Sequence, residues 1–237
     1  MSDITLQQVA ATIDHTILKP DTTRTDIDRI CAEAIQHNFA AVCVPPAYIK
    51  KSVKQLRKTP VRVATVLGFP MGYVPRLVKL YELNDCIARG AHEIDMVVNV
   101  GAIKDKRWRY VHNEIQMLAK DAHNQKTVLK VIIESGLLTQ EEIIAACDVC
   151  ADCGVDFVKT STGFNGPGAT VEVISLMRRI LPPSVKIKAS GGIRTLEQAI
   201  ALIKAGADRL GCSRGVEIVG EFSKQGNNVS GDHTDGY

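Results

Sequence analysis

Five ionisable residues lie inside short apolar runs, where a folded chain rarely places a charge. They are Asp14, Asp95, Lys130, Lys159 and Lys188. One such charge alone often belongs to a strand end, with its head group in water. A charge inside a packed interior is costly unless it is paired or used for chemistry. Five of them on separate runs therefore predict one shared polar pocket.

Lys159 and Lys188 are the two residues that indicate a reaction. If their strands are neighbours, their backbones run about 5 Å apart. Two ammonium groups about 5 Å apart repel by about 3 kcal/mol at an effective dielectric constant of about 20, which lowers the pKa of one lysine towards neutrality. A neutral amine attacks a carbonyl carbon, and the other ammonium, with a carboxylate such as Asp95, can move protons. The pair therefore predicts Schiff-base chemistry.

Two glycine-containing segments predict a phosphate site. Residues 190–195 read SGGIRT and residues 211–215 read GCSRG, and each follows an apolar strand candidate. Backbone N–H groups of such loops bind phosphate at helix N-termini, and eight-stranded barrels use the loops after strands seven and eight for this purpose. Gly163, which follows the sixth strand candidate, extends the predicted site.

Metal chemistry has less support. The six histidines show neither an H-x-H nor an H-x-x-x-H spacing, so we expect no metal. Cys147, Cys150 and Cys153 have the C-x-x-C-x-x-C spacing of iron–sulfur ligands, which an irregular loop must bring together. Here a capping box begins at Thr139 and Gly154 ends the segment. We therefore predict a helix that packs small buried thiols.

Eight short apolar runs, which would hold these residues, alternate with amphipathic segments. The runs are residues 12–16, 39–44, 61–67, 93–99, 128–134, 156–160, 186–189 and 209–211. Such runs are typical of strands that are covered on both faces. The periodicity also allows a doubly wound open sheet, but G-x-G-x-x-G is missing after the first run. We predict one α/β domain, a single (β/α)8 TIM barrel over residues 1–225, with a flexible C-terminal tail over 226–237.

The amino-acid composition and charge bear on which classes of partner the protein binds. Apolar residues make up 45% and charged residues 23% of the 237 residues, and the formal charge is +3. No basic block predicts nucleic-acid binding, and no apolar run reaches the roughly 20 residues that span a bilayer. The seven cysteines are an odd number, which favours reduced thiols in a cytoplasmic protein. We expect neither a nucleic-acid nor a membrane partner.

The motifs resemble those of the 2-deoxyribose-5-phosphate aldolase family over about residues 9–222. They are DHT at 14–16, EIDMVVNVG at 93–101, KVIIE at 130–134, VKTSTG at 158–163 and KASGGIRT at 188–195. The resemblance implies a barrel that reversibly cleaves 2-deoxy-D-ribose 5-phosphate to acetaldehyde and D-glyceraldehyde 3-phosphate without a cofactor. It also implies small phosphosugar and aldehyde substrates and a homodimer.

The resemblance also assigns roles. Lys159 would form the Schiff base, Lys188 would lower its pKa, and Asp95 would relay protons. The supporting residues would be Lys130, Asp14 and Thr160, and the phosphate-binding ones Gly163, Gly191, Gly192 and Ser213. Tyr237 matches a terminal tyrosine that relays protons in some members. Arg214 departs from the family pattern, which has a small residue there, and would either add a phosphate contact or crowd the site. Apart from the resemblance, we expect Cys43, at the end of the second strand candidate, to be the thiol most vulnerable to oxidation or aldehydes. Two alternatives stay open: a phosphosugar isomerase, and a barrel that binds a sugar phosphate without catalysis.

Overall fold

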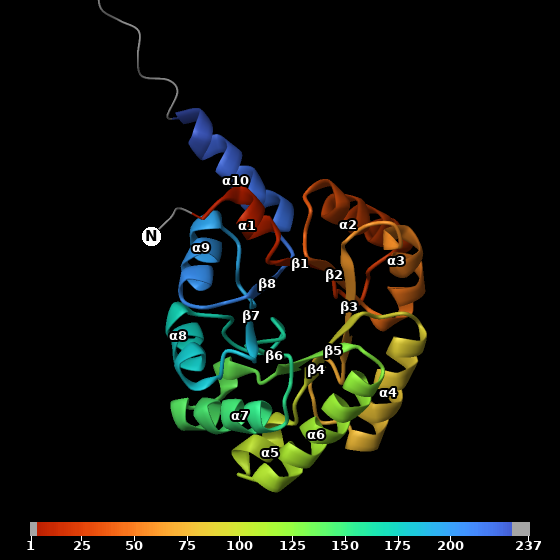
Figure 1. Ribbon diagram of the computed structural model, residues 1–237, viewed down its shortest axis with the longest axis vertical. Coiled ribbons are helices and arrows are strands. Elements are labelled where there is room, and N and C mark those ends of the chain that lie inside the picture. Colours follow the sequence, from red (N-terminus) through yellow and green to blue (C-terminus); the bar gives the residue numbers. More distant parts are fainter. Residues whose placement is uncertain (1–3, 229–237) are drawn as a thin grey trace, which may run out of the picture.

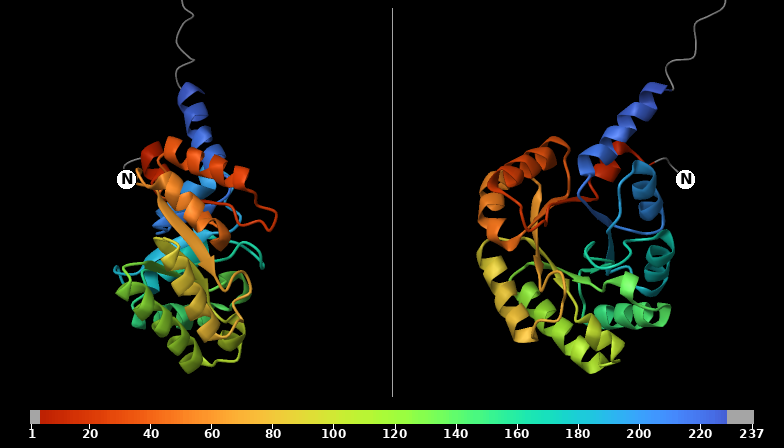
Figure 2. Two further views of the ribbon diagram at one scale, coloured as in Figure 1. Left: turned by 90° about the vertical axis from the view of Figure 1, so that its right-hand side faces the viewer. Right: turned by 180° about the vertical axis from the view of Figure 1, so that it is seen from behind.

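Eight parallel strands close into a barrel in sequence order, and helices surround it (Figures 1 and 2). The computed structural model describes residues 4–228. The ring closes where β1 pairs with β8. The strands are β1 (Ile13–Thr16), β2 (Ala41–Val44), β3 (Arg62–Leu67), β4 (Glu93–Val97), β5 (Val128–Ile132), β6 (Phe157–Lys159), β7 (Lys186–Ser190) and β8 (Arg209–Cys212). The predicted (β/α)8 barrel is confirmed.

Helices alternate with these strands along the chain. α1 (Leu6–Ala10) precedes β1, and α10 (Gly215–Asn228) follows β8. Between them lie α2 (Arg24–Gln36), α3 (Ile49–Leu56), α4 (Arg76–Ala88), α5 (Val100–Lys104), α6 (Trp108–Asn124), α7 (Gln140–Asp152), α8 (Val171–Ile180), α9 (Leu196–Lys204) and the 3-10 turns η1 (Pro46–Tyr48) and η2 (Ser135–Leu137). In the described part of the chain, no helix is both long and apolar enough to cross a membrane.

Threonine N-caps determine where several helices begin. The hydroxyls of Thr23, Thr139 and Thr195 each accept a hydrogen bond from the backbone N–H three residues later, at the starts of α2, α7 and α9. In each case the N3 side chain returns a bond to the backbone of the cap. A cap of this kind stabilises a helix by about 1 kcal/mol. The short sequence signals therefore place the helices that follow β1, β5 and β7.

The cysteine-rich segment forms α7, as its capping box predicts. Cys147 and Cys150 lie buried between this helix and the rest of the core, and Cys153 is half-buried at the helix end. Burial raises the pKa of the Cys147 thiol to about 12, so it stays protonated near neutral pH. The C-x-x-C-x-x-C spacing here is a consequence of helical packing.

Several strands end before the apolar runs do. Within the run 93–99 the strand ends at Val97, and within the run 128–134 it ends at Ile132. Asn99 instead caps α5, because its side-chain oxygen accepts a bond from the N–H of Ala102. Glu134 takes the left-handed conformation. Asn99 and Glu134, at the carboxyl ends of these two runs, thus lie outside the sheet.

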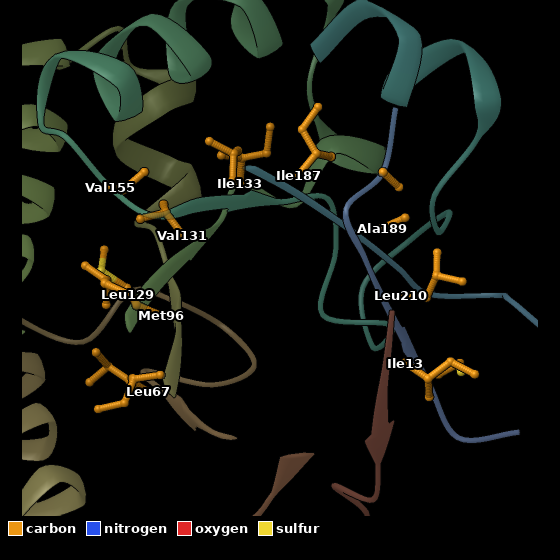
Figure 3. Close-up of a cluster of buried hydrophobic side chains, with 14 of the residues drawn as sticks. Ile13, Leu67, Met96, Leu129, Val131, Ile133, Val155, Ile187, Ala189 and Leu210 are labelled. Atoms are coloured by element: carbon orange, nitrogen blue, oxygen red, sulfur yellow. The ribbon is translucent and has the colours of Figure 1, made fainter. Parts of the chain in front are cut away.

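Two apolar layers support the barrel. The larger layer fills the space between the strands and the helices, and Figure 3 shows members of it such as Ile13, Met96 and Val131. The smaller one lies inside the barrel and consists of Ala41, Cys43, Ala64 and Val66, all from β2 and β3. The remaining interior, towards β4 to β8 and β1, carries charged side chains instead of a packed apolar core.

The domain boundary predicted at residue 225 lies inside α10, which continues to Asn228. The rest of the predicted tail, 229–237, lies outside the described residues, and so does Tyr237. The barrel and its flanking helices form one continuous core in the described part. The two-part division stays a prediction.

Candidate active site

Strand register brings the predicted charges together. Lys159 on β6 pairs with Lys188 on β7, and Asp95 on β4 pairs with Lys130 on β5. Paired residues of neighbouring parallel strands point to the same side, and here that side is the barrel interior. Asp14, Asp95, Lys130 and Lys188 are completely buried, and Lys159 is 3% exposed. All five predicted charges therefore lie together inside the barrel.

Asp95 is the centre of this cluster. Its Oδ1 accepts a hydrogen bond from Lys130 Nζ at 2.8 Å, and its Oδ2 accepts from Lys159 Nζ at 2.8 Å and from Lys188 Nζ at 2.7 Å. Burial alone would raise the pKa of Asp95, but the three lysines outweigh it and hold that pKa well below its ordinary value. The carboxylate is thus ionised and both of its oxygens are occupied.

The two paired lysines have different electrostatic environments. Burial lowers the pKa of Lys159, Asp95 opposes this effect, and the nearby Lys188 adds to it. Burial also acts on Lys188, but Asp14, whose Oδ2 lies 2.5 Å from Lys188 Nζ, together with Asp95 raises its pKa above the ordinary value. Lys159 is therefore the lysine that loses its proton more readily. Repulsion by Lys188, the cause predicted from the sequence, contributes to the lowered pKa of Lys159, and burial is the larger cause.

Two further charges, which sequence reasoning missed, complete the cluster. Glu93 lies 2.7 Å from Lys130 Nζ and 3.2 Å from the guanidinium of Arg209. Arg209 Nε donates to Asp14 Oδ1 at 2.8 Å. Glu93 shares the inner face of β4 with Asp95 through the period of two, a signal that was available. Arg209 begins β8, where a charge reads as an ordinary strand end.

A cavity of about 460 Å³ opens above Lys159 at the carboxyl ends of the strands. All of the predicted phosphate residues line it, namely Gly163, Gly191, Gly192, Ser213 and Arg214. Residues that were not predicted also contribute, among them the cationic Lys19 and Arg194 and the aromatic Phe164. The structure therefore brings the Schiff-base candidate and both glycine loops into one cavity, with three cationic side chains along its lining.

Close backbone contacts shape the glycine loops. A Cβ on Gly168 would lie 2.0 Å from the carbonyl oxygen of Gly191, so these two loops touch through their backbones. Gly191 itself has a φ of +88°, a conformation that favours glycine. Gly163, with a φ of +84°, also packs against Gly191, since a Cβ on Gly191 would lie 3.5 Å from the Gly163 Cα. The loops after β6 and β7 therefore form one continuous wall.

The other predicted residues have supporting or separate positions. Thr160 bridges β6 and β7: its hydroxyl donates to the carbonyl of Ser190 at 3.1 Å and accepts from the same residue's N–H at 3.0 Å. Cys43 lies on the inner apolar wall, where burial and then Asp95 raise the pKa of its thiol. A raised pKa weakens a thiol as a nucleophile, which argues against the predicted vulnerability.

The histidines do not assemble a metal site in the described residues. His15 Nε2 lies 2.7 Å from a carboxylate oxygen of Glu33, as expected for a hydrogen-bonded core histidine. Within residues 4–228, no group of three or more histidine, cysteine, aspartate and glutamate side chains is arranged to hold a metal ion.

Comparison with known proteins gives a consistent result. The family model described as DeoC/LacD family aldolase matches residues 8–221. A deoxyribose-phosphate aldolase of Clostridium perfringens is 49% identical over 90% of this chain and 94% of its own length. One of Thermococcus gammatolerans is 50% identical over 89% of this chain and 95% of its own length.

Solved structures agree in fold. A putative deoxyribose-phosphate aldolase from Coccidioides immitis superposes with a TM-score of 0.89 at 43% identity, covering 92% of this chain and 87% of that one. The tetrameric deoxyribose phosphate aldolase from Aeropyrum pernix gives a TM-score of 0.87 at 31% identity, covering 93% of each chain.

Proposed function

The chain belongs to the DeoC/LacD aldolase family and is therefore a lyase, and from that premise we propose that it reversibly cleaves 2-deoxy-D-ribose 5-phosphate to acetaldehyde and D-glyceraldehyde 3-phosphate. The observation that carries the proposal is the sharing of one carboxylate oxygen of Asp95 by Lys159 and Lys188, below a cavity lined by glycine loops. Such an arrangement suits a carbonyl at one end of the substrate and a phosphate at the other.

Lys159 acts as the nucleophile in the proposed reaction. Its neutral amine bonds to the aldehyde carbon C1 of the open-chain sugar, one proton is taken up, and water leaves, which gives an iminium ion. The hydroxyl on C3 then loses its proton, the C2–C3 bond breaks, and its electron pair moves towards the iminium nitrogen. Glyceraldehyde 3-phosphate departs and leaves an enamine on Lys159. Protonation at C2 and hydrolysis then release acetaldehyde and regenerate the amine.

Asp95 and Lys188 move the protons of these steps. Asp95 Oδ2 accepts a hydrogen bond from Lys159 Nζ and another from Lys188 Nζ, so one oxygen joins the three groups. Lys188 is charged before the reaction begins, since Asp14 and Asp95 raise its pKa, and its positive charge then favours a neutral Lys159. A water molecule between Asp95 and the substrate would complete the relay. Lys130 and Asp14 support these two residues, because Lys130 balances the charge of Asp95 and Asp14 balances the charge of Lys188.

The glycine loops bind the phosphate in this proposal. Backbone N–H groups near Gly163, Gly191–Gly192 and Ser213 offer the type of contact that phosphate accepts at helix N-termini. Arg214 lines the same cavity and is exposed at its mouth, which favours the added phosphate contact over crowding. The phosphate thus anchors the sugar with its aldehyde towards Lys159.

Incubation with 2-deoxyribose 5-phosphate tests the proposal. We expect equimolar acetaldehyde and triose phosphate from the wild-type chain and none above background from Lys159→Met. Lys186→Met is the matched control, because Lys186 begins the neighbouring strand β7, is exposed and should leave the rate unchanged. Phosphate-sugar binding without turnover would instead favour the non-catalytic barrel, and interconversion without cleavage would favour the isomerase.

We also propose that the chain pairs with a second copy. Exposed large apolar side chains gather on the loop after β3 and on α4; they are Met71, Tyr73, Leu77, Val78 and Tyr81. Apolar patches of this kind on a folded protein mark interaction surfaces. The Aeropyrum pernix relative is described as tetrameric, which supports self-association as the use of this surface. The cytoplasmic location suggested by the cysteines stays a prediction.

A further inference from the structure

Glu134 has a backbone conformation that its residue type disfavours. It follows β5 with φ 53° and ψ 56°, in the left-handed region. The other non-glycine residues with positive φ in the described chain, Asn38, Lys106 and Lys126, are exposed, whereas Glu134 is buried. Buried residues keep such a conformation only where the surroundings impose it, and they cluster at functional sites.

The side chain of Glu134 holds the loop that follows β6. Its Oε1 accepts from the backbone N–H of Thr162 at 3.0 Å, and its Oε2 accepts from the Thr162 hydroxyl at 2.5 Å. The same hydroxyl accepts from the N–H of Phe164 at 3.1 Å, so its proton must point to Glu134. Asn165 Nδ2 extends the contact, at 3.4 Å from Oε2 and 3.1 Å from the carbonyl of Pro70.

A carboxylate matches these donors with one acceptor oxygen each. The Thr162 N–H and hydroxyl are both donors towards Glu134, and a carboxylate offers two acceptor oxygens. A glutamine has one acceptor oxygen and would present its NH₂ to one of the two donors. Gly163, between Thr162 and Phe164, packs against Gly191 and lines the cavity. The carboxylate therefore fixes the residues on either side of the glycine that faces the ligand.

We propose that Glu134 is a positioning residue for the phosphate end of the substrate. It acts through Thr162, whose placement sets the Gly163 turn against Gly191 and so the geometry in which backbone groups meet the phosphate. The inference rests on the proposed function for the identity of the substrate. The phosphate-binding part stands independently of turnover, because inorganic phosphate alone is a sufficient probe.

The test compares two substrates in Glu134→Gln. For 2-deoxyribose 5-phosphate, we expect KM to rise about tenfold or more, which corresponds to the loss of one charge-assisted hydrogen bond. For 2-deoxyribose without the phosphate, we expect kcat/KM to change by less than about threefold. Calorimetric binding of inorganic phosphate should weaken by a similar factor of about ten. Preference for the phosphorylated sugar would thus fall.

Matched variants separate positioning from general damage. Glu172→Gln makes the same change at an exposed residue in the first turn of α8 and should alter neither measurement. Thr162→Val removes the hydroxyl and should reproduce the effect of Glu134→Gln, and Thr162→Ser should restore wild-type binding. Thermal unfolding checks that each variant is folded, and Thr162→Val carries the test if Glu134→Gln does not fold.

The outcomes distinguish the two proposals. If the wild type cleaves neither sugar, the proposed function fails, and phosphate binding by Glu134→Gln and Thr162→Val still decides the role of Glu134. Suppose that the wild type cleaves the phosphorylated sugar. The positioning role is then wrong if Thr162→Val loses kcat/KM equally for both sugars, or if it keeps its affinity for inorganic phosphate.

Discussion

At the scale of single residues, the Asp95 carboxylate is the shared hydrogen-bond acceptor of three lysines. Asp95 accepts bonds from Lys130, Lys159 and Lys188 in a fully buried site. Lys130 and Lys188 have further acidic partners in Glu93 and Asp14, and the pKa of each is raised above its ordinary value despite burial. Lys159 has Asp95 as its carboxylate partner among the described residues, and its pKa is lowered. The partner set therefore explains why Lys159 is the amine that reacts.

The pH dependence of imine formation should reflect this difference. Because its pKa is lowered, Lys159 loses its proton at a pH below 10.5, the ordinary pKa of a lysine side chain. Imine formation should therefore rise with pH through a midpoint below 10.5. Lys188→Met removes a like charge and leaves more of the Asp95 charge to Lys159. Both changes raise the pKa of Lys159, so the midpoint should move to higher pH. The measurement is the rate of borohydride-trapped adduct against pH.

The control for this profile is Lys186→Met, whose side chain is exposed at the start of β7. It should leave the midpoint in place. A midpoint for Lys188→Met that is unchanged, or that moves to lower pH, would show that Lys188 does not set the protonation of Lys159.

Asp95 also contributes to folding stability. Asp95→Asn leaves three buried ammonium groups short of a counter-charge, and we expect a loss of roughly 3–5 kcal/mol in urea unfolding at neutral pH. Because the folded pKa of Asp95 is depressed, its contribution is complete above the ordinary value of 3.8 and is lost as pH falls below it. The difference from wild type should therefore shrink in acid. Asp148→Asn, at an exposed position of α7, should stay within about 0.5 kcal/mol of wild type, and an equal loss in both variants would argue against the charge cluster as the cause.

Sequence reasoning identified part of this network. Lys159 and Asp95 stand in the middle of apolar runs, where a charge conflicts with its surroundings and is therefore conspicuous. Arg209 begins its strand, and Glu134 ends an apolar run. A charge at such a position looks the same whether it reaches water or turns inward. The missing knowledge was the direction of the side chain, which only the packed barrel determines.

At the scale of elements, the loops after β6 and β7 form the cavity wall through direct backbone contact. Gly168→Ala would place a Cβ 2.0 Å from the Gly191 carbonyl and push the two loops apart. A displacement of about 1 Å in a substrate-positioning segment can cost about a hundredfold, so we expect KM for the phosphorylated sugar to rise by about tenfold or more. Steady-state kinetics measures this change.

Gly220→Ala is the matched control for that substitution. Gly220 lies within α10, and a Cβ there meets nothing within 4 Å. Replacement of a helical glycine by alanine stabilises by about 0.5–1 kcal/mol, so this variant should be slightly more stable with an unchanged KM. A Gly168→Ala variant with wild-type KM would mean that the contact with Gly191 does not shape the site.

Element positions were predictable to within a few residues, and the differences have local causes. The runs 93–99 and 128–134 were predicted to be strands over their whole length. Asn99 instead caps the N-terminus of α5, and Glu134 binds a neighbouring loop. A run of apolar letters does not reveal where the chain leaves the sheet. Capping boxes are short-range signals, which is why the start at Thr139 was predicted correctly.

At the scale of the whole molecule, barrel closure depends on a contact between the chain's first and last strands. β1 pairs with β8, which lies almost 200 residues later in the sequence, as the pair of Asp14 with Gly211 shows. Alternating strand and helix patterns are compatible with open and closed sheets alike. The regular number of units favoured closure, whereas the ion pair of Asp14 with Arg209 across that seam was beyond local pattern analysis.

The exposed apolar surface of α4 predicts the oligomeric state. The double variant Leu77→Asp/Tyr81→Asp places two charges on that surface, where both side chains are mostly exposed in the single chain. We expect a change from dimer to monomer in sedimentation velocity with little loss of folding stability. Ile35→Asp, at an exposed position of α2, is the control and should stay dimeric. A wild-type chain that is monomeric at micromolar concentration would refute the pairing.

The central claim is that Lys159 forms the covalent intermediate, and reductive trapping tests it most directly. The protein is incubated with acetaldehyde and borohydride, and the modified peptides are mapped by mass spectrometry. We predict one stoichiometric adduct on Lys159, absent in Lys159→Met and unaffected by Lys186→Met. An adduct on Lys188 instead, or adducts scattered over exposed lysines with none on Lys159, would contradict the account.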